Sequence, residues 1–513
     1  MTDSQENLVP EQKPVHSTAD VVFAWLCLLF GYLFCRTLPV TENPLGGFLL
    51  VLLLYGTAAV ILILKKVRLT GTFLAAGISA VVISVSLILT ESAFILHLAY
   101  TYAIASYFYF LYAAFGNRLE TGCSDYIFID YFQALFLFPF RSLLRIFPAL
   151  FQGKGKPILI LVGKVFCGIL IAAIPTAVVL GLLCYDESFR TLLEDIFSAD
   201  TQEISSHMMS ALWGIPVAMA LFGLFFSASR KTVTARTDAA GAQAGIEKLR
   251  AIPKLTVVSA VVPILFLYVV FFVSQWKYYI SGFTGDLPEG FSYAEYAREG
   301  FFQLCAVSAI NLILLVAITL FTRRGSEKPS AVIRILSCVF CLFTLILIST
   351  AVAKLVMYIS TYGLTHKRIY AMWLMAVIAI VYLVITVGQF VKGLKTVFVS
   401  LAVCVVMFAG LSMCNVSRVT ADYNIGRYLD GTLETVDMEL MEELGNSAIP
   451  ALAELAEEIK TDPKQHDAAL CMKLVGILKD KATTFQEQEF AIFSFNFPAY
   501  QAEAALRDSG YME

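Results

Sequence analysis

The sequence predicts an all-α protein, a polytopic transmembrane helical bundle of about 11 spans with a small C-terminal helical domain. Hydrophobic residues make up 58% of the 513 residues and charged residues only 15%, whereas soluble domains have roughly 45–50% and about 25%. Several apolar runs also reach the roughly 18 residues that indicate a membrane span. This composition excludes a soluble enzyme, a disordered chain, a disulfide scaffold and a nucleic-acid-binding protein.

Eleven apolar segments are long enough to be expected to cross the membrane. They lie at 21–38, 46–64, 69–89, 93–115, 157–185, 207–229, 255–276, 300–322, 331–358, 369–391 and 396–414. The first is short and ends at Arg36, and only Glu91 and Ser92 separate the third from the fourth. Fusion or failure of these segments would change the count and the side on which the chain ends.

Lys and Arg collect in alternate loops, which predicts the orientation. The loops after even-numbered spans hold 20 of them, and the loops after odd-numbered spans hold 6. Because positively charged loops stay in the cytoplasm, we expect the loops after even-numbered spans and the N-terminus to lie on that side. An odd number of spans then places the C-terminus outside.

Changes in charge and composition predict five regions. A cytoplasmic tail at 1–20 lacks the basic start of a signal peptide. A first membrane half at 21–229 with six spans and a second at 255–414 with five are joined by a basic cytoplasmic linker at 230–254. Residues 415–513 hold 18 acidic and 8 basic residues and are expected to form an acidic extracytoplasmic helical domain.

Helical spacing of apolar residues predicts the elements of that domain. Residues 440–459 form one apolar series of helical spacing, in which Pro450 is expected at a first helical position after Asn446 or Ser447, and a second helix is expected over 467–481. A third is expected to end near Gly510.

Residues 126–152 are aromatic and apolar but are interrupted by charges and prolines. Arg141 and Arg145 would share one face of a helix, and a helix in the inner membrane interface would turn them towards anionic lipid headgroups. The alternative is a re-entrant hairpin broken at Pro139.

No catalytic, cofactor or metal motif is found in the chain. The zinc-protease, phosphate-loop and nucleophile-elbow patterns are missing. The histidines lie in five separate regions, at His16, His97, His207, His366 and His466. Cys338 and Cys341 have redox-motif spacing, but they lie in an apolar segment, where a thiol packs as a small hydrophobe. We therefore expect no cofactor, no metal and no catalytic residue.

Polar residues near two predicted span ends predict a binding site. Ser292 and Glu295 match a helix capping box, so Glu295 and Glu299 would descend on one helix face towards the membrane. Lys354 lies within an apolar span, where a charge is costly and is expected to be paired and functional. The predicted outer-leaflet pocket consists of Glu295, Arg298, Glu299, Lys354, Tyr358, Tyr362 and Arg368. The alternatives are a purely structural ion network and a lysine that extends its amine to the surface.

Three segments resemble signatures of a bacterial multi-pass membrane family known only as a domain of unknown function. Tyr358 to Arg368 resembles its Tyr-x-x-x-Tyr-Gly-Leu-Thr-x-x-Arg signature, and Tyr293 to Leu304 resembles Tyr-Ala-x-x-Ala-Arg-x-Gly-Phe-x-x-Leu. Asn415 to Asp430 is similar to the family's Asn-x8-Asn-Ile-x-Arg arm, followed by Ala448 to Leu452, similar to Ala-Ile-Pro-Ala-Leu. The likeness covers roughly residues 160 to 460. It implies no activity, but it implies that 293–304 and 358–368 form one outer-face feature.

Two classes of function fit these features. The first is non-enzymatic, namely envelope sensing, or transport of a small solute or lipid through the predicted pocket. The second is an intramembrane enzyme that acts on a lipid-linked substrate, with Glu295 or Glu299 as base. A further alternative is a scaffold that recruits an envelope protein through residues 415–513.

Overall fold

The computed structural model describes residues 18–67, 71–152, 201–230, 238–274, 276, 301–323, 331–461, 468–487 and 491–512, with isolated positions between 153 and 200. These residues form helices joined by short turns. Their only β-type pairing is an isolated bridge between Ile252 and Thr322. The prediction of an all-α polytopic bundle is confirmed.

Nine helices in the described part of the chain are long and apolar enough to cross a membrane. They are α1 (Thr18–Thr37), α2 (Pro44–Leu64), α5 (Ala93–Ala114), α11 (Thr201–Arg230), α13 (Lys254–Ser274), α16 (Phe301–Phe321), α17 (Ala331–Tyr362), α18 (His366–Gly388) and α19 (Thr396–Met413). Each coincides with an expected span. The span expected at 157–185 falls on residues that, apart from isolated positions, lie outside the described part.

The span expected at 69–89 is shorter and broken in the structure. It forms α3 (Thr72–Ser84) and α4 (Ser86–Leu89), which meet at Val85. The hydroxyls of Ser84 and Ser86 each donate a 2.7 Å hydrogen bond to the carbonyl three residues earlier, a contact that bends helices. The segment is therefore an apolar helix pair below the length of the nine spans.

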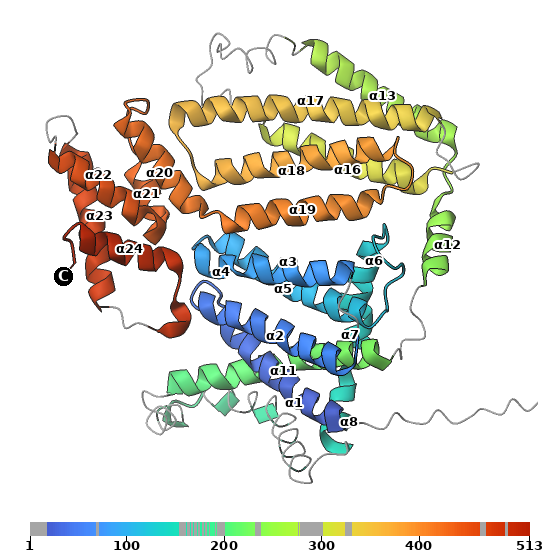
Figure 1. Ribbon diagram of the computed structural model, residues 1–513, viewed down its shortest axis with the longest axis horizontal. Helices are drawn as coiled ribbons and strands as arrows, with labels where there is room; N and C mark the ends of the chain where they lie inside the picture. The colour runs from blue at the N-terminus through green and yellow to red at the C-terminus, as the bar shows by residue number, and fades with distance from the viewer. Residues whose placement is uncertain are drawn as a thin grey trace, which may run out of the picture.

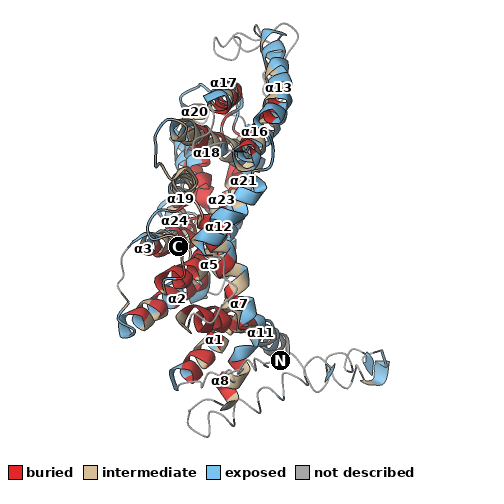
Figure 2. Ribbon diagram, turned by 90° about the vertical axis from the view of Figure 1, so that its right-hand side faces the viewer, coloured by how far each residue is buried: buried red, intermediate tan, exposed pale blue. Residues whose placement is uncertain are grey.

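The helices of the bundle lie side by side, and the C-terminal helices cover one end of it (Figure 1). The closest pair is α1 and α11, which cross where Gly31 meets Gly214. A Cβ atom added to Gly31 would lie 2.0 Å from the Gly214 carbonyl oxygen. Among the nine long apolar helices α5 and α11 are the most buried, whereas α13 is largely exposed (Figure 2). Its exposed apolar side chains are those that a bilayer would cover.

Loops that follow even-numbered expected spans meet at the end of the bundle opposite the C-terminal helices (Figure 1). There Lys395 pairs with Glu120 at 3.0 Å, and Arg230 at the end of α11 pairs with Asp20. The predicted linker, next to this end, contains α12 (Ala239–Leu249), which Asp238 caps. The grouping of loops agrees with their expected alternation across the membrane.

The interfacial helix expected at 126–152 is not continuous. It consists of α6 (Ile127–Phe132), a π-helical stretch Gln133–Leu137, α7 (Phe138–Arg141), a 3-10 turn Leu143–Arg145 and α8 (Ile146–Gln152), with a bend of 48° after Arg141. The prediction that Arg141 and Arg145 share a helix face is therefore wrong. The break falls at Ser142, three residues after Pro139, because α11 packs there. Ser227 donates to the Ser142 hydroxyl at 2.7 Å. Headgroup binding by the two arginines stays a prediction.

The C-terminal helices are α20 (Val416–Leu429), α21 (Met438–Glu443), α22 (Ile449–Thr461), α23 (Ala468–Glu487) and α24 (Phe497–Asp508), with a 3-10 turn at Gly445–Ala448. They share a core of their own, built from Met441, Leu452, Leu455, Leu474, Leu478 and Leu506. The apolar series at 440–459 is divided between α21 and α22 at Gly445, whose φ is 65°. Pro450 is the second residue of α22, one position after the expected first. Division of the chain into the five regions stays a prediction.

Candidate functional site

Four of the seven predicted site residues lie in the described part of the chain. Lys354, Tyr358 and Tyr362 are on the last three turns of α17, and Arg368 is in the first turn of α18. Glu295, Arg298 and Glu299 lie outside the described residues. The pairing of Lys354 with one of these glutamates therefore stays a prediction.

The turn between α17 and α18 brings three of the predicted residues together. The Arg368 guanidinium lies over the ring of Tyr358, 4.0 Å from its centroid, and Tyr358 and Tyr362 are in edge contact at 5.2 Å. Arg368 also donates to the carbonyl of Tyr362 at 3.1 Å and to the carbonyl of Gly363. A cation over an aromatic face is stabilised. Through these contacts Arg368 stabilises the turn that connects α17 to α18.

Lys354 lies one helical turn before Tyr358 on α17 and is 1% exposed. Tyr362, by contrast, is 47% exposed. A buried ammonium is costly unless it is paired or hydrogen-bonded. This burial does not fit a lysine that extends its amine to the membrane surface.

Asn424 of α20 binds the backbone of the same turn. Its Oδ1 accepts a hydrogen bond from the Leu364 N–H at 2.6 Å, and its Nδ2 donates to the Leu364 carbonyl at 2.8 Å. Gly363, with a φ of 75°, is required beside it, since a Cβ there would lie 2.5 Å from the Asn424 Oδ1. Asn424 is 4% exposed, so both bonds are shielded from water.

Two more residues of α20 hold the flanks of the turn. Arg427 donates to the Ile359 carbonyl at 3.3 Å, and its Nη2 donates to the Thr432 carbonyl at 2.7 Å. Ser417 is hydrogen-bonded to the Nε2 of His366 at 2.8 Å. We call Ser417, Asn424 and Arg427 the α20 clamp. It ties the C-terminal helices to the turn that contains Tyr362 and leads to Arg368.

Further contacts attach the C-terminal helices to the turn between α4 and α5. Glu91 accepts a 2.7 Å hydrogen bond from the Asn446 side chain. The neighbouring Ser92 attaches the same turn to α18 instead, through a 2.6 Å hydrogen bond with Tyr370. Burial raises the pKa of Glu91, although the hydrogen bonds from Asn446 and Ser447 oppose this. The carboxyl is thus part of a shielded contact between the bundle and the C-terminal helices.

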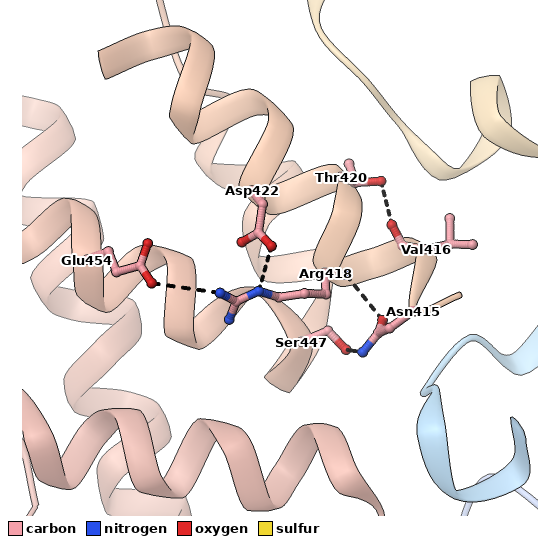
Figure 3. Close-up of polar contacts among 7 residues, drawn as sticks. All are labelled: Asn415, Val416, Arg418, Thr420, Asp422, Ser447 and Glu454. Atoms are coloured by element: carbon pink, nitrogen blue, oxygen red, sulfur yellow. Dashed lines mark hydrogen bonds and ion pairs between the residues drawn. The ribbon is translucent and has the colours of Figure 1, made fainter. Parts of the chain in front are cut away.

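The first turn of α20 is fixed to α22 (Figure 3). Asn415 caps α20 by accepting from the Arg418 N–H at 3.1 Å, and it donates to the Ser447 hydroxyl at 3.1 Å. Arg418 lies between Asp422, at 2.8 Å, and Glu454, at 3.8 Å. A displacement of the α20 clamp would therefore move α22 with it.

Sequence reasoning placed Asn424 and Arg427 only within the resemblance and gave them no role. Asn424 and Arg427 bind backbone groups 60 or more residues away. A backbone group is the same at every position, so the sequence does not indicate that it has such a partner. Among the described residues no group of three or more His, Cys, Asp or Glu is placed to hold a metal ion. What the described side chains make is a closed, hydrogen-bonded joint.

The model of the family described as "Domain of unknown function (DUF4153)" matches residues 21–455. No curated protein matches the chain, and no solved structure does. The family match extends from α1 to α22 and includes the predicted site and the α20 clamp. The chain is a multi-pass membrane protein that belongs to the DUF4153 family.

Proposed function

We propose that the protein is a non-enzymatic envelope sensor of the bacterial cytoplasmic membrane. The ligand binds the polar pocket of Glu295, Arg298, Glu299, Lys354, Tyr358, Tyr362 and Arg368. The responding element is the domain formed by residues 415–513. The N-terminus lies in the cytoplasm, and the pocket and this domain face the outside.

One observation supports this proposal above the others. The turn that joins Tyr362 to Arg368 is the segment that the α20 clamp holds, through the two hydrogen bonds of Asn424 to Leu364. The pocket and the C-terminal domain are therefore connected through the backbone N–H and carbonyl of Leu364, which Asn424 binds. Transport or catalysis does not require such a connection, whereas sensing does.

The same geometry supplies a mechanism. Arg368 donates to the carbonyls of Tyr362 and Gly363 and covers Tyr358. An anionic group of the ligand would compete for the Arg368 donors, so that the carbonyls of Tyr362 and Gly363 lose them. The ligand then binds more tightly to the conformation without these two hydrogen bonds, and such a difference in affinity shifts the population towards that conformation. Hydrogen bonds to a charged group are worth about 1.5–3 kcal/mol, so the equilibrium of clamp attachment would change by roughly 12- to 150-fold.

A complementation experiment tests the sensor. A strain that lacks its own copy would receive the wild type, Asn424→Ala, or a control Asp437→Ala variant, which loses the N-cap of α21. We expect Asn424→Ala to abolish the response at normal membrane abundance and Asp437→Ala to retain it. A response that survives Asn424→Ala but is lost with Lys354→Ala would favour transport or catalysis by the pocket and overturn the sensor.

The proposed orientation has its own test. A phosphatase or fluorescent-protein fusion at Glu513 reports the side on which the chain ends. Phosphatase activity outside the cytoplasm is the expected result. Fluorescence without phosphatase activity would mean that the pocket and the C-terminal domain lie at the inner face.

A further inference from the structure

The segment that leads into α24 is apolar although the region around it is acidic. Residues 491–500 read Ala-Ile-Phe-Ser-Phe-Asn-Phe-Pro-Ala-Tyr, without a charge, whereas residues 415–513 hold 18 acidic and 8 basic residues. Four of its side chains are largely exposed: Ile492 at 67%, Phe493 at 58%, Phe497 at 41% and Tyr500 at 58%. Clustered exposed apolar side chains mark a surface that something covers.

Contact with α2 sets the depth of this segment relative to the bilayer. A Cβ atom on Gly46 would lie 3.8 Å from the Phe493 Cβ. Helix α2 has 21 residues, which at about 1.5 Å per residue corresponds to about 31 Å, close to the roughly 30 Å of the hydrocarbon core. Gly46, in the first turn of α2, thus marks the edge of the hydrocarbon, and Phe493 lies at the level of the headgroups.

The exposed segment is also continuous with a surface that faces lipid. Below Gly46, α2 exposes Leu49, Leu52 and Leu53 to 43%, 38% and 47%. Leu49 is three residues further along the helix, about 4.5 Å deeper. The aromatic side chains of 491–500 therefore extend the lipid-facing surface of α2 upwards into the interface.

We propose that residues 491–500 form an interfacial anchor, which lays Ile492, Phe493, Phe497 and Tyr500 into the headgroup layer of the leaflet that the C-terminal helices face. Tyr and Trp are enriched at this depth, where their amphipathic rings lie at the level of the headgroups, and Tyr500 fits this preference. The rings of Phe497 and Tyr500 stack at 6.3 Å. The anchor binds lipid through apolar contact, so its occupant is the bilayer surface and not a lipid of particular charge.

The anchor would attach the domain of residues 415–513 at a second place. The α20 clamp holds the domain through α20, and the anchor holds it through α24 at a second place. The domain is then attached to the bundle at one side and to the bilayer at the other.

Fluorescence with lipid-borne quenchers tests the anchor on the full-length protein in nanodiscs. Phe493→Trp and Tyr500→Trp add a reporter to the segment, and Met472→Trp adds one at a 74% exposed position of α23. The signal of the native tryptophans is removed by subtraction of the parent protein. The discs contain zwitterionic phospholipids with or without bromine on the upper acyl chain.

We expect the added emission of Phe493→Trp and Tyr500→Trp to be blue-shifted and to lose intensity with brominated lipid. The Met472→Trp emission should be red-shifted and unaffected. Equal emission of all three, insensitive to bromine, would overturn the anchor. A blue shift that ignores bromine and rises with the number of protein copies per disc would also overturn it, in favour of contact with a second copy.

Discussion

Replacement of Asn424 by alanine should detach the C-terminal helices from the turn between α17 and α18. The variant loses the 2.6 Å bond from the Leu364 N–H and the 2.8 Å bond to its carbonyl. Each bond contributes about 0.5–1.5 kcal/mol, and a shielded peptide group left without partners adds about 1–3 kcal/mol. A total loss of about 2–6 kcal/mol corresponds to a roughly 30- to 20,000-fold rise in the population of the detached state.

Hydrogen exchange of the full-length protein in nanodiscs measures this change. Amides in 359–367 and 416–429 should exchange faster by that factor, whereas those of α22 should keep their protection. Asp437→Ala is the control, since loss of the bonds from the Glu439 and Leu440 N–H groups, each 3.1 Å long, should affect α21 alone. Unchanged exchange in both peptides, or faster exchange throughout α22, would refute the assignment of Asn424 to the joint.

Three further changes test other parts of the structure. Gly31→Leu should lower the free energy of unfolding by about 1–3 kcal/mol or more, because its Cβ would lie 2.0 Å from the Gly214 carbonyl oxygen. The unfolding temperature should fall with it. Gly56→Leu, with no atom within 4 Å, should not lower it. Since burial raises the pKa of Glu91 above its ordinary 4.5, its stabilising contribution is greatest below pH 4.5 and declines as pH rises through the raised pKa. Glu91→Gln should remove this dependence from unfolding midpoints, and an identical pH profile would contradict it. Arg368→Lys should speed hydrogen exchange over 363–368, because an ammonium cannot cover Tyr358 and bridge two carbonyls as a guanidinium does; unchanged exchange would argue against closure of the turn by this side chain.

The sequence predicted the spans well because one physical requirement determines them. A helix in a bilayer needs about 20 apolar residues, and nine of the expected segments have helices of that length. Interruptions within helices were harder to predict. The bend at Ser142 and the break at Val85 depend on hydrogen bonds of serine side chains, whose partners are known only once the neighbouring helices are in place.

The candidate site was predictable in part for a similar reason. A lysine inside an apolar span and a Tyr-Gly-Leu-Thr turn stand out in the sequence, and the structure brings Tyr358, Tyr362 and Arg368 together. The α20 clamp was not predictable, because Asn424 and Arg427 bind the peptide groups of Leu364 and Ile359. A peptide group is the same at every position, so nothing in the local sequence indicates its partner.

The crossing of Gly31 and Gly214 also constrains how the protein is made. Helix α1 ends at Thr37 and α11 ends at Arg230. A ribosome adds about 5–20 residues per second, so on the order of 10–40 s pass between the synthesis of α1 and that of α11. During that interval the surface of α1 around Gly31 is not yet covered by α11. The contact at Gly31 therefore forms only after α11 has been inserted, although α1 is among the first helices to be made.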